Sequence, residues 1–215
     1  LVTDTNLDIY YVKDRSSPKT FFLFKLTPHV EPPGAILWRK KAGSNYSAHA
    51  LAIDAENYIY ITGNIWHSVR NYIMNGQQQH MWNSEIMFLQ KYDTSGSLQW
   101  ETLQSCHHVS LPTYEPYWVS IWAKFITLQS NNVLIGGTTS CKCGNQTTTG
   151  NVHTVIMNYS SQGSWQGTFE PDLRQIPNYC DGGRGGMFGL ALDTSQGLYS
   201  VHTVEQKQSS FCDAS

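Results

Sequence analysis

The sequence predicts an all-β protein, because short runs of alternating apolar residues are separated by polar turns. In "AHALAIDAENYIYITG" (48–63), two alternating runs flank a turn that contains Asp54 and Asn57, which predicts two antiparallel strands. The same plan returns in "VSIWAKFITLQSNNVLIGG" (119–137) and "MFGLALDTSQGLYSVHT" (187–203). We therefore expect antiparallel strands and essentially no helix.

A second kind of hairpin follows each of the first two. It occurs at "EIMFLQKYDTSGSLQWETL" (85–103) and "HTVIMNYSSQGSWQGTF" (153–169), with a tyrosine, a polar turn containing a glycine, and a tryptophan. Two hairpins make a unit of four strands. The N-terminal segments "DIYYVKD" (8–14), "FFLFKLT" (21–27) and "GAILWRK" (34–40) match the last three strands of such a unit.

These units repeat at a nearly constant spacing. Gly34 and Gly96 are 62 residues apart, and Gly96 and Gly163 are 67 residues apart. A period of this length with four strands per unit is typical of β-propeller blades. Over residues 1–215 we expect one array with complete blades at 48–103 and 118–169 and partial blades at 8–40 and 187–204.

The tryptophan of each unit is expected to lie where neighbouring blades meet, at Trp38, Trp100 and Trp165. The pair "AIDAENYIYITG" and "KYDTSGSLQW" resembles the β-propeller repeat of secreted bacterial and eukaryotic proteins, a seven-bladed type of propeller. In that repeat an Asp-containing turn and G-N-x-Y-V-T-G precede K-Y-D-x-x-G-x-x-x-W. Residues 48–103 fit best, whereas "NVLIGG" and "GLYSVHT" depart from the pattern. The resemblance implies a fold to which no single activity is attached.

A β-sandwich or a jelly roll is the alternative architecture, but the long repeat distance favours the propeller. The predicted strands, about ten to twelve, are too few for a comfortable ring of at least four blades. The chain also begins at Leu1, without an initiator methionine or a signal segment. We therefore expect the sequence to be a window on a longer chain.

The composition argues against two classes of partner. Charged residues make up only 14% of the chain and the net charge is −2, which disfavours a nucleic-acid binder because phosphate recognition needs clustered Lys and Arg. No run of apolar residues is long enough to span a bilayer, so we expect no membrane insertion within this chain.

Glycosylation signals indicate an extracellular, secreted or cell-surface protein. N-x-Ser/Thr sequons occur at Asn45, Asn145 and Asn158. Asn45 and Asn145 are expected in loops. Asn158 falls within a strand, and its alignment with Lys25 and Lys91 predicts that it lies on the outward, polar side of that strand.

All five cysteines fall in the long predicted loops or beyond the last strand, where disulfides can form: Cys106, Cys141, Cys143, Cys180 and Cys212. We expect one bridge from Cys106 to Cys141 or Cys143, and another from Cys180 to Cys212 or to the remaining member of the C-x-C pair. A zinc site is the alternative, but C-x-C and C-H-H are not the spacings of a closed tetrahedral site. No metal or other cofactor is expected.

The long loops should all lie on one face of the array, which is where binding usually resides. The loop at 64–84 carries aromatic and imidazole side chains that could stack on and hydrogen-bond a sugar: Trp66, His67, Tyr72 and Trp82. They could equally pack the loop onto the scaffold. "NG" (75–76) predicts a tight hairpin turn within this loop.

No residue pattern requires a catalytic explanation. The chain has no G-x-S-x-G motif, and "DGGRGGMFG" (181–189) lacks the G-K-[ST] ending of a phosphate loop, so we interpret it as a connection. Asp54, Asp93 and Asp193 are expected to form turns by accepting hydrogen bonds from the following backbone amides.

We therefore expect a non-enzymatic, extracellular glycosylated propeller module. Its role would be that of a structural or adhesive scaffold whose partners are other proteins or copies of itself. The alternatives are a carbohydrate-binding, lectin-like propeller and a part of an enzyme whose catalytic residues lie outside this window.

Overall fold

The computed structural model describes residues 1–16, 19–27, 35–67, 70–74, 77–81, 84–104, 121–139, 153–169, 185–193, 195 and 197–204. These residues form strands and the turns between them, with no helix in the ranges just given. The prediction of an all-β chain is confirmed. In the described part of the chain there is consequently no helix that is long and apolar enough to cross a membrane.

Three antiparallel sheets have four strands each, and two further sheets have two strands. Sheet 1 contains β1 (Val2–Thr3), β2 (Ile9–Ser16), β3 (Lys19–Thr27) and β4 (Ala35–Lys41). Sheet 2 contains β5 (Tyr46–Ile53), β6 (Ile59–His67), β9 (Ser84–Tyr92) and β10 (Leu98–Gln104). Sheet 3 contains β11 (Ile121–Gln129), β12 (Asn132–Thr139), β13 (His153–Ser160) and β14 (Trp165–Phe169). Sheet 4 contains β15 (Gly185–Leu192) and β16 (Leu198–Val204), and a small hairpin contains β7 (Arg70–Met74) and β8 (Gln77–Met81).

The strand pairing agrees with the predicted hairpins. β9 pairs with β10, with Tyr92 opposite Leu98, and β7 pairs with β8, with Met74 opposite Gln77, as the "NG" turn predicted. Sheet 1 differs from the expected three strands, because the short β1 pairs with β2 and places Val2 opposite Tyr10. The first unit therefore also begins with a hairpin.

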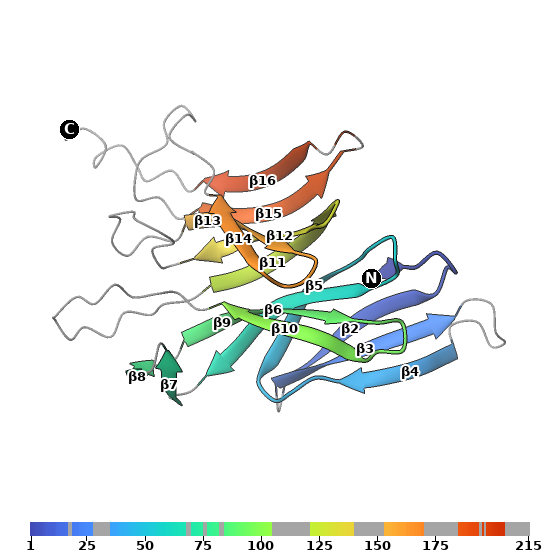
Figure 1. The fold of residues 1–215 in the computed structure, drawn as a ribbon, viewed down its shortest axis with the longest axis horizontal. Helices are drawn as coiled ribbons and strands as arrows, with labels where there is room; N and C mark the ends of the chain where they lie inside the picture. The colour runs from blue at the N-terminus through green and yellow to red at the C-terminus, as the bar shows by residue number, and fades with distance from the viewer. Residues whose placement is uncertain are drawn as a thin grey trace.

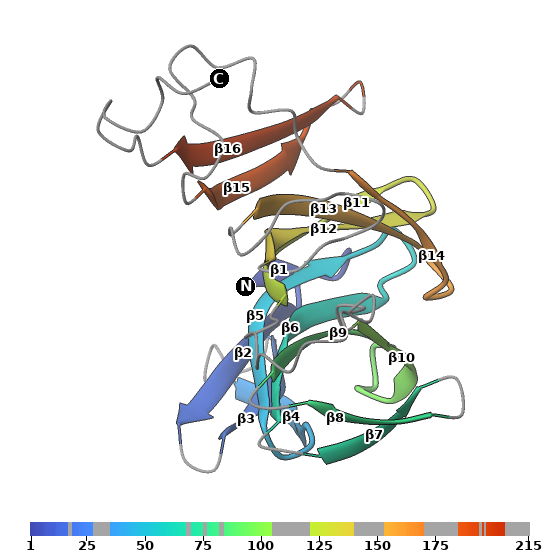
Figure 2. The same cartoon turned by 90° about the vertical axis from the view of Figure 1, so that its left-hand side faces the viewer.

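The four sheets follow one another in space in the order of the chain (Figures 1 and 2). An apolar cluster lies between each pair of neighbours. Phe21 of sheet 1 stacks on Phe88 of sheet 2, and Leu89 of sheet 2 lies in one cluster with Ile135 of sheet 3. Met187 of sheet 4 completes the smaller cluster against sheet 3.

Strands in the middle of this arrangement are buried on both faces. In β6, Ile59 and Ile61 belong to the cluster against sheet 1, whereas Tyr60 between them belongs to the cluster against sheet 3. In β9, Phe88 belongs to the cluster against sheet 1 and Leu89 to the cluster against sheet 3. Two buried faces explain why "IMFLQKY" is an almost continuous apolar run rather than an alternating one.

Polar contacts also join β5, the first strand of sheet 2, to the sheets on either side. The Asp14 carboxylate of β2 accepts a hydrogen bond from the backbone amide of Ala48 in β5 at 3.0 Å. His49 of β5 in turn contacts the carbonyl oxygen of Ala123 in β11 through Nδ1 at 2.6 Å. Sheets 1, 2 and 3 are therefore joined through β5 by hydrogen bonds as well as by the apolar clusters. The described residues form an open, propeller-like succession of sheets rather than a closed ring.

Candidate functional site

The residues predicted to bind sugar are only partly placed. Trp66 lies near the end of β6, is half-buried, and donates its backbone N–H to the carbonyl oxygen of Asn45 at 2.9 Å. His67 belongs to β6 and Tyr72 to β7, but their side chains, like the whole of Trp82, lie outside the described residues. A carbohydrate site at these residues stays a prediction.

Asn45 is the sequon residue whose surroundings are clearest. It occupies the turn before β5 with a left-handed φ of 71°, a conformation that asparagine tolerates better than most residues. Asn145 and the five cysteines, which are Cys106, Cys141, Cys143, Cys180 and Cys212, lie outside the described residues. Glycosylation and disulfide formation therefore remain predictions.

Asn158 does not lie on an outward polar face, contrary to the reasoning from its alignment with lysines. Lys91 is only 7% exposed and hydrogen-bonds the carbonyl oxygen of Ser161 in sheet 3, so the equivalent side of sheet 2 faces the next sheet. The Oδ1 atom of Asn158 is itself buried without a hydrogen-bond partner. The prediction for Asn158 assumed that an aligned lysine marks the solvent-exposed side of a strand. Lys91 is instead buried and hydrogen-bonded at this position.

Four turns share an aspartate that organises the backbone, at Asp4, Asp54, Asp93 and Asp193. In each, Oδ1 accepts hydrogen bonds from the amides two and four residues later. For Asp54 these amides belong to Glu56 and Tyr58, at 3.0 and 2.8 Å. The prediction that Asp54, Asp93 and Asp193 cap their turns is confirmed.

The second carboxylate oxygen of each aspartate accepts a side-chain hydrogen bond from the residue six positions later. Tyr10 donates to Asp4 at 2.9 Å, Tyr60 to Asp54 at 3.0 Å and Tyr199 to Asp193 at 3.0 Å. In the remaining turn the donor is Gln99, to Asp93 at 2.9 Å. The spacing Asp-x5-Tyr, present three times in the sequence, was the signal that could have revealed this bond.

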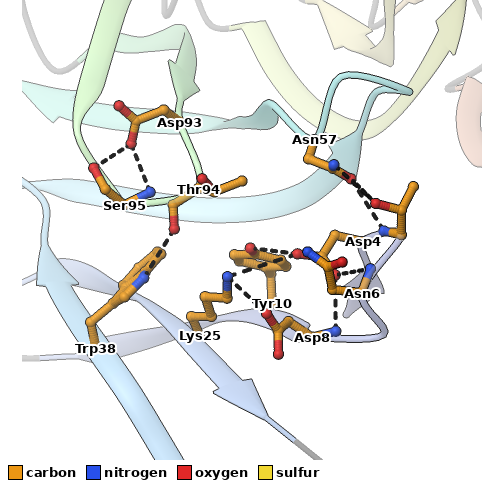
Figure 3. Close-up of polar contacts among 11 residues, drawn as sticks. Asp4, Asn6, Asp8, Tyr10, Lys25, Trp38, Asn57, Asp93, Thr94 and Ser95 are labelled. Atoms are coloured by element: carbon orange, nitrogen blue, oxygen red, sulfur yellow. Dashed lines mark hydrogen bonds and ion pairs between the residues drawn. The ribbon is translucent and has the colours of Figure 1, made fainter.

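A lysine and a tryptophan complete this arrangement in sheets 1 and 2. We call each set of four residues an inter-sheet cluster. Its members are Asp4, Tyr10, Lys25 and Trp38 in sheet 1, and Asp54, Tyr60, Lys91 and Trp100 in sheet 2. The lysine Nζ lies 5.3 Å from the tyrosine ring centroid in sheet 1 and 5.1 Å in sheet 2. The tyrosine and tryptophan centroids are 6.0 and 6.1 Å apart. The two clusters therefore have nearly the same distances. Figure 3 shows the residues of the cluster in sheet 1.

Burial changes the acidity of these groups. It raises the pKa of Tyr10 to about 12, since the phenolate would lose its hydration, and the neighbouring Lys25 opposes this only in part. Burial lowers the pKa of Lys25, but hydrogen bonds to Asp8 and Tyr10 outweigh it, so that the pKa lies above its ordinary value. Lys25 also forms an ion pair with Asp8 at 2.8 Å. At neutral pH the tyrosine is neutral and the lysine is charged.

The turn of the next sheet covers each cluster. Gly96 lies over the indole ring of Trp38, and a Cβ at this glycine would come within 2.9 Å of the ring. Trp38 Nε1 donates to the carbonyl oxygen of Thr94 in the same turn at 3.1 Å (Figure 3). Gly163 of sheet 3 lies against Trp100 at the same distance, although the buried Trp100 Nε1 has no hydrogen-bond partner. Trp38 and Trp100 thus lie where neighbouring sheets meet, as expected.

The prediction for Trp165 was wrong. Trp100 is opposite Lys91, and the residue opposite Asn158 in sheet 3 is Gly167, two positions beyond Trp165. Trp165 pairs instead with Tyr159 and is 58% exposed. Sheet 3 also has Leu134 where sheets 1 and 2 have the tyrosine. Sheet 3 therefore lacks the cluster.

Sheet 4 retains the aspartate and the tyrosine, at Asp193 and Tyr199. The described residues contain no group of three or more His, Cys, Asp or Glu side chains that could hold a metal ion. The repeated polar chemistry in this part of the chain instead joins one sheet to the next.

Comparison with known proteins adds no relative. No protein-family model matches the chain, and no curated protein matches it.

Proposed function

We propose that the chain is part of an extracellular, glycosylated β-propeller that serves as a structural or adhesive scaffold in a larger assembly. One observation carries the proposal: the inter-sheet cluster is built twice with nearly the same distances, and the glycine turn of the following sheet covers it each time. Successive sheets that contact through equivalent residues are what a propeller requires of its blades.

The elements of a scaffold are present in these contacts. Apolar clusters lie between successive sheets, and hydrogen bonds such as the one from the Ala48 amide of β5 to the Asp14 carboxylate of β2 also join them. Interdigitated side chains buried on both faces give a stiff support for long loops. In this proposal the loops that follow β6, β10 and β12 carry the contacts with partners, and Asn45 before β5 and Asn145 after β12 carry glycans.

The lectin-like alternative predicts a different result in a direct binding experiment. The purified chain, its Trp66→Ala variant and a Trp165→Ala control are applied to a glycan array. A scaffold gives no saturable binding in any of the three. The chain would be a lectin if it bound a glycan saturably, if Trp66→Ala removed the binding and if Trp165→Ala left it unchanged. Of these two tryptophans, only Trp66 belongs to the predicted aromatic loop.

A second experiment tests membership of an assembly. Material from the native source is cross-linked and separated by size, and the chain is located by peptide mass. The proposal expects the chain in a complex larger than itself. Recovery only as a free monomer would contradict a scaffold role.

A further inference from the structure

The hydroxyl residue of the Asn45 sequon is bonded to sheet 1 in the folded chain. Ser47 donates from Oγ to the Asp14 carboxylate of β2, and the amide of the next residue, Ala48, donates to the other oxygen of that carboxylate at 3.0 Å. The N-x-Ser/Thr signal includes this hydroxyl. Folding therefore engages a group that glycosylation of Asn45 needs.

The middle residue of the sequon is fixed by packing. The ring of Tyr46 lies edge-on to that of Phe88, with centroids 5.1 Å apart, and it also meets the ring of Phe21 in sheet 1 at 6.5 Å. The Tyr46 hydroxyl donates to the Glu101 carboxylate of β10 at 2.9 Å. This side chain therefore ties the sequon to the last strand of sheet 2 and to sheet 1.

Asn45 is fixed through its main chain. Its carbonyl oxygen accepts the backbone N–H of Trp66 at 2.9 Å, which continues the pairing of Tyr46 with Ile65 between β5 and β6. Its φ of 71° is left-handed, so the sequon is not extended in the folded chain. An enzyme that binds the Asn45 amide and the Ser47 hydroxyl together in its own site has to release these contacts first.

Two of the groups that hold the sequon come later in the chain. Glu101 lies 55 residues after Tyr46, and Trp66 lies between them. At synthesis rates of roughly 5–20 residues per second, Glu101 is made roughly 3–11 s after Tyr46. During that interval the sequon lacks its contact with β10.

We infer that Asn45 receives its glycan during synthesis, before β10 completes sheet 2, and that the folded chain is not an acceptor. In this step Asn45 Nδ2 forms a bond to C1 of the first sugar of a lipid-linked oligosaccharide. The bond from C1 to the lipid pyrophosphate breaks with its electron pair left on the pyrophosphate, and the amide loses one proton. The inference rests on the proposed glycosylated scaffold, because it states when one of its glycans is attached.

Purified oligosaccharyltransferase with a lipid-linked oligosaccharide tests the inference. One substrate is the folded 215-residue chain produced without glycans, and the other is a synthetic peptide of residues 42–50, which has the sequon without Asp14, Trp66 or Glu101. Peptide mass measures modification of Asn45. The folded chain should be modified at least roughly a hundredfold more slowly than the peptide, since only its small opened fraction can react.

A pair of acidic variants tests the contact with sheet 1. Asp14→Ala leaves the sequon itself unaltered but removes the acceptor of the Ser47 and Ala48 hydrogen bonds, so modification of the folded chain should be several-fold faster. Glu56→Ala is the matched control, because Glu56 is an exposed acidic residue in the β5–β6 turn, and its rate should equal that of the original chain. Circular dichroism verifies that both variants retain their strands.

Two outcomes overturn the inference. One is a folded chain that is modified at Asn45 as fast as the peptide, and the other is a rate that Asp14→Ala and Glu56→Ala change equally. Either result leaves the scaffold proposal to its own experiments, because the acceptor assay uses chain that was produced without glycans. Native material without any glycan would instead contradict the glycosylated scaffold itself.

Discussion

Gly163 lies against the indole ring of Trp100, so closely that a Cβ at this glycine would come 2.9 Å from the ring atom Cε3. Gly96 has the same relationship to Trp38, also at 2.9 Å. Both glycines have positive φ, 82° and 75°. One residue type therefore meets two requirements at the contact between sheets: a left-handed turn, and room for the aromatic ring of the preceding sheet.

Gly163→Ala should lower the free energy of unfolding by roughly 1–3 kcal/mol, because the new methyl group both strains the backbone and displaces the Trp100 ring. Gly189→Ala is the matched control. Its nearest neighbours are atoms of Val201 at 3.8 Å, an ordinary van der Waals distance, so this variant should be neutral or slightly stabilised. Urea denaturation measures both, and equal effects would contradict the close contact.

A second pair of variants isolates the bond from tyrosine to aspartate. Tyr60 and Tyr199 make this bond at the same distance of 3.0 Å, but Tyr60 is 1% exposed and Tyr199 is 60% exposed. Tyr60→Phe should cost about 1–2 kcal/mol, since Asp54 loses a partner where water has little access. Tyr199→Phe should change stability by less than about 0.5 kcal/mol, because water replaces the hydroxyl. A large effect of Tyr199→Phe would show that its surroundings are not open.

The local features of this fold could be predicted from the sequence. The aspartate turns could be predicted because an aspartate caps amides only two and four residues away. The strand pairs within each hairpin followed from alternation and from the turns. These interactions depend on residues that are close in the chain.

The contacts between sheets were harder to predict. Trp165 was matched to Trp100 by residue type, although Gly163 precedes Trp165 by two positions and Gly96 precedes Trp100 by four. Counting from the glycine would have placed Gly167 at the tryptophan position. Lys91 was interpreted as a surface residue, because a sequence does not display the carbonyl oxygen of Ser161 and the ring of Tyr60 that compensate its burial.

Alkaline pH should lower the free energy of unfolding, because several tyrosines of the folded chain have raised pKa values. Tyrosine ionises near pH 10 in an unfolded chain, whereas burial raises the pKa of Tyr10 to about 12 and also raises those of Tyr46, Tyr60 and Tyr92. Between pH 10 and pH 12 the unfolded state releases protons that the folded state retains, so stability falls as pH rises. Below pH 10 this contribution is fully present.

Urea denaturation at a series of pH values, with tyrosinate absorbance as a second readout, measures this slope. Tyr10→Phe should make the slope shallower above pH 10, because one of the groups with a raised pKa is removed. If stability fell equally steeply with pH in Tyr10→Phe, the raised pKa of the buried Tyr10 hydroxyl would not be a cause of the pH dependence.

Glycans are expected on Asn45 and Asn145, and on Asn158 if its sequon is modified before the strand folds. The intact mass of native material should fall after glycosidase treatment, and peptide mapping should find aspartate at each modified asparagine. Asn45→Asp removes one site while keeping a residue that tolerates the left-handed φ of 71°. An unchanged mass would remove the main argument for an extracellular location.

The cysteines provide the last test, because the strand directions predict that their loops lie on one side. β10 runs away from the Asp93 turn and ends at Gln104, two residues before Cys106. β12 runs away from the turn at 130–131 and ends at Thr139, two residues before Cys141. β16 runs away from the Asp193 turn and ends at Val204, eight residues before Cys212 in the sequence.

We therefore expect a bridge from Cys106 to Cys141 or Cys143, and one from Cys180 to Cys212 or to the remaining cysteine of the C-x-C pair. Each requires Cα atoms roughly 4.4–6.8 Å apart and would contribute about 2–4 kcal/mol by restricting the unfolded chain. Because five is odd, one thiol stays free or bonds a residue outside this sequence. Peptide mapping without reductant identifies the pairs. Alkylation of all five thiols in unreduced protein would refute both the shared side of these loops and the oxidising compartment, since neither predicts a fully reduced chain.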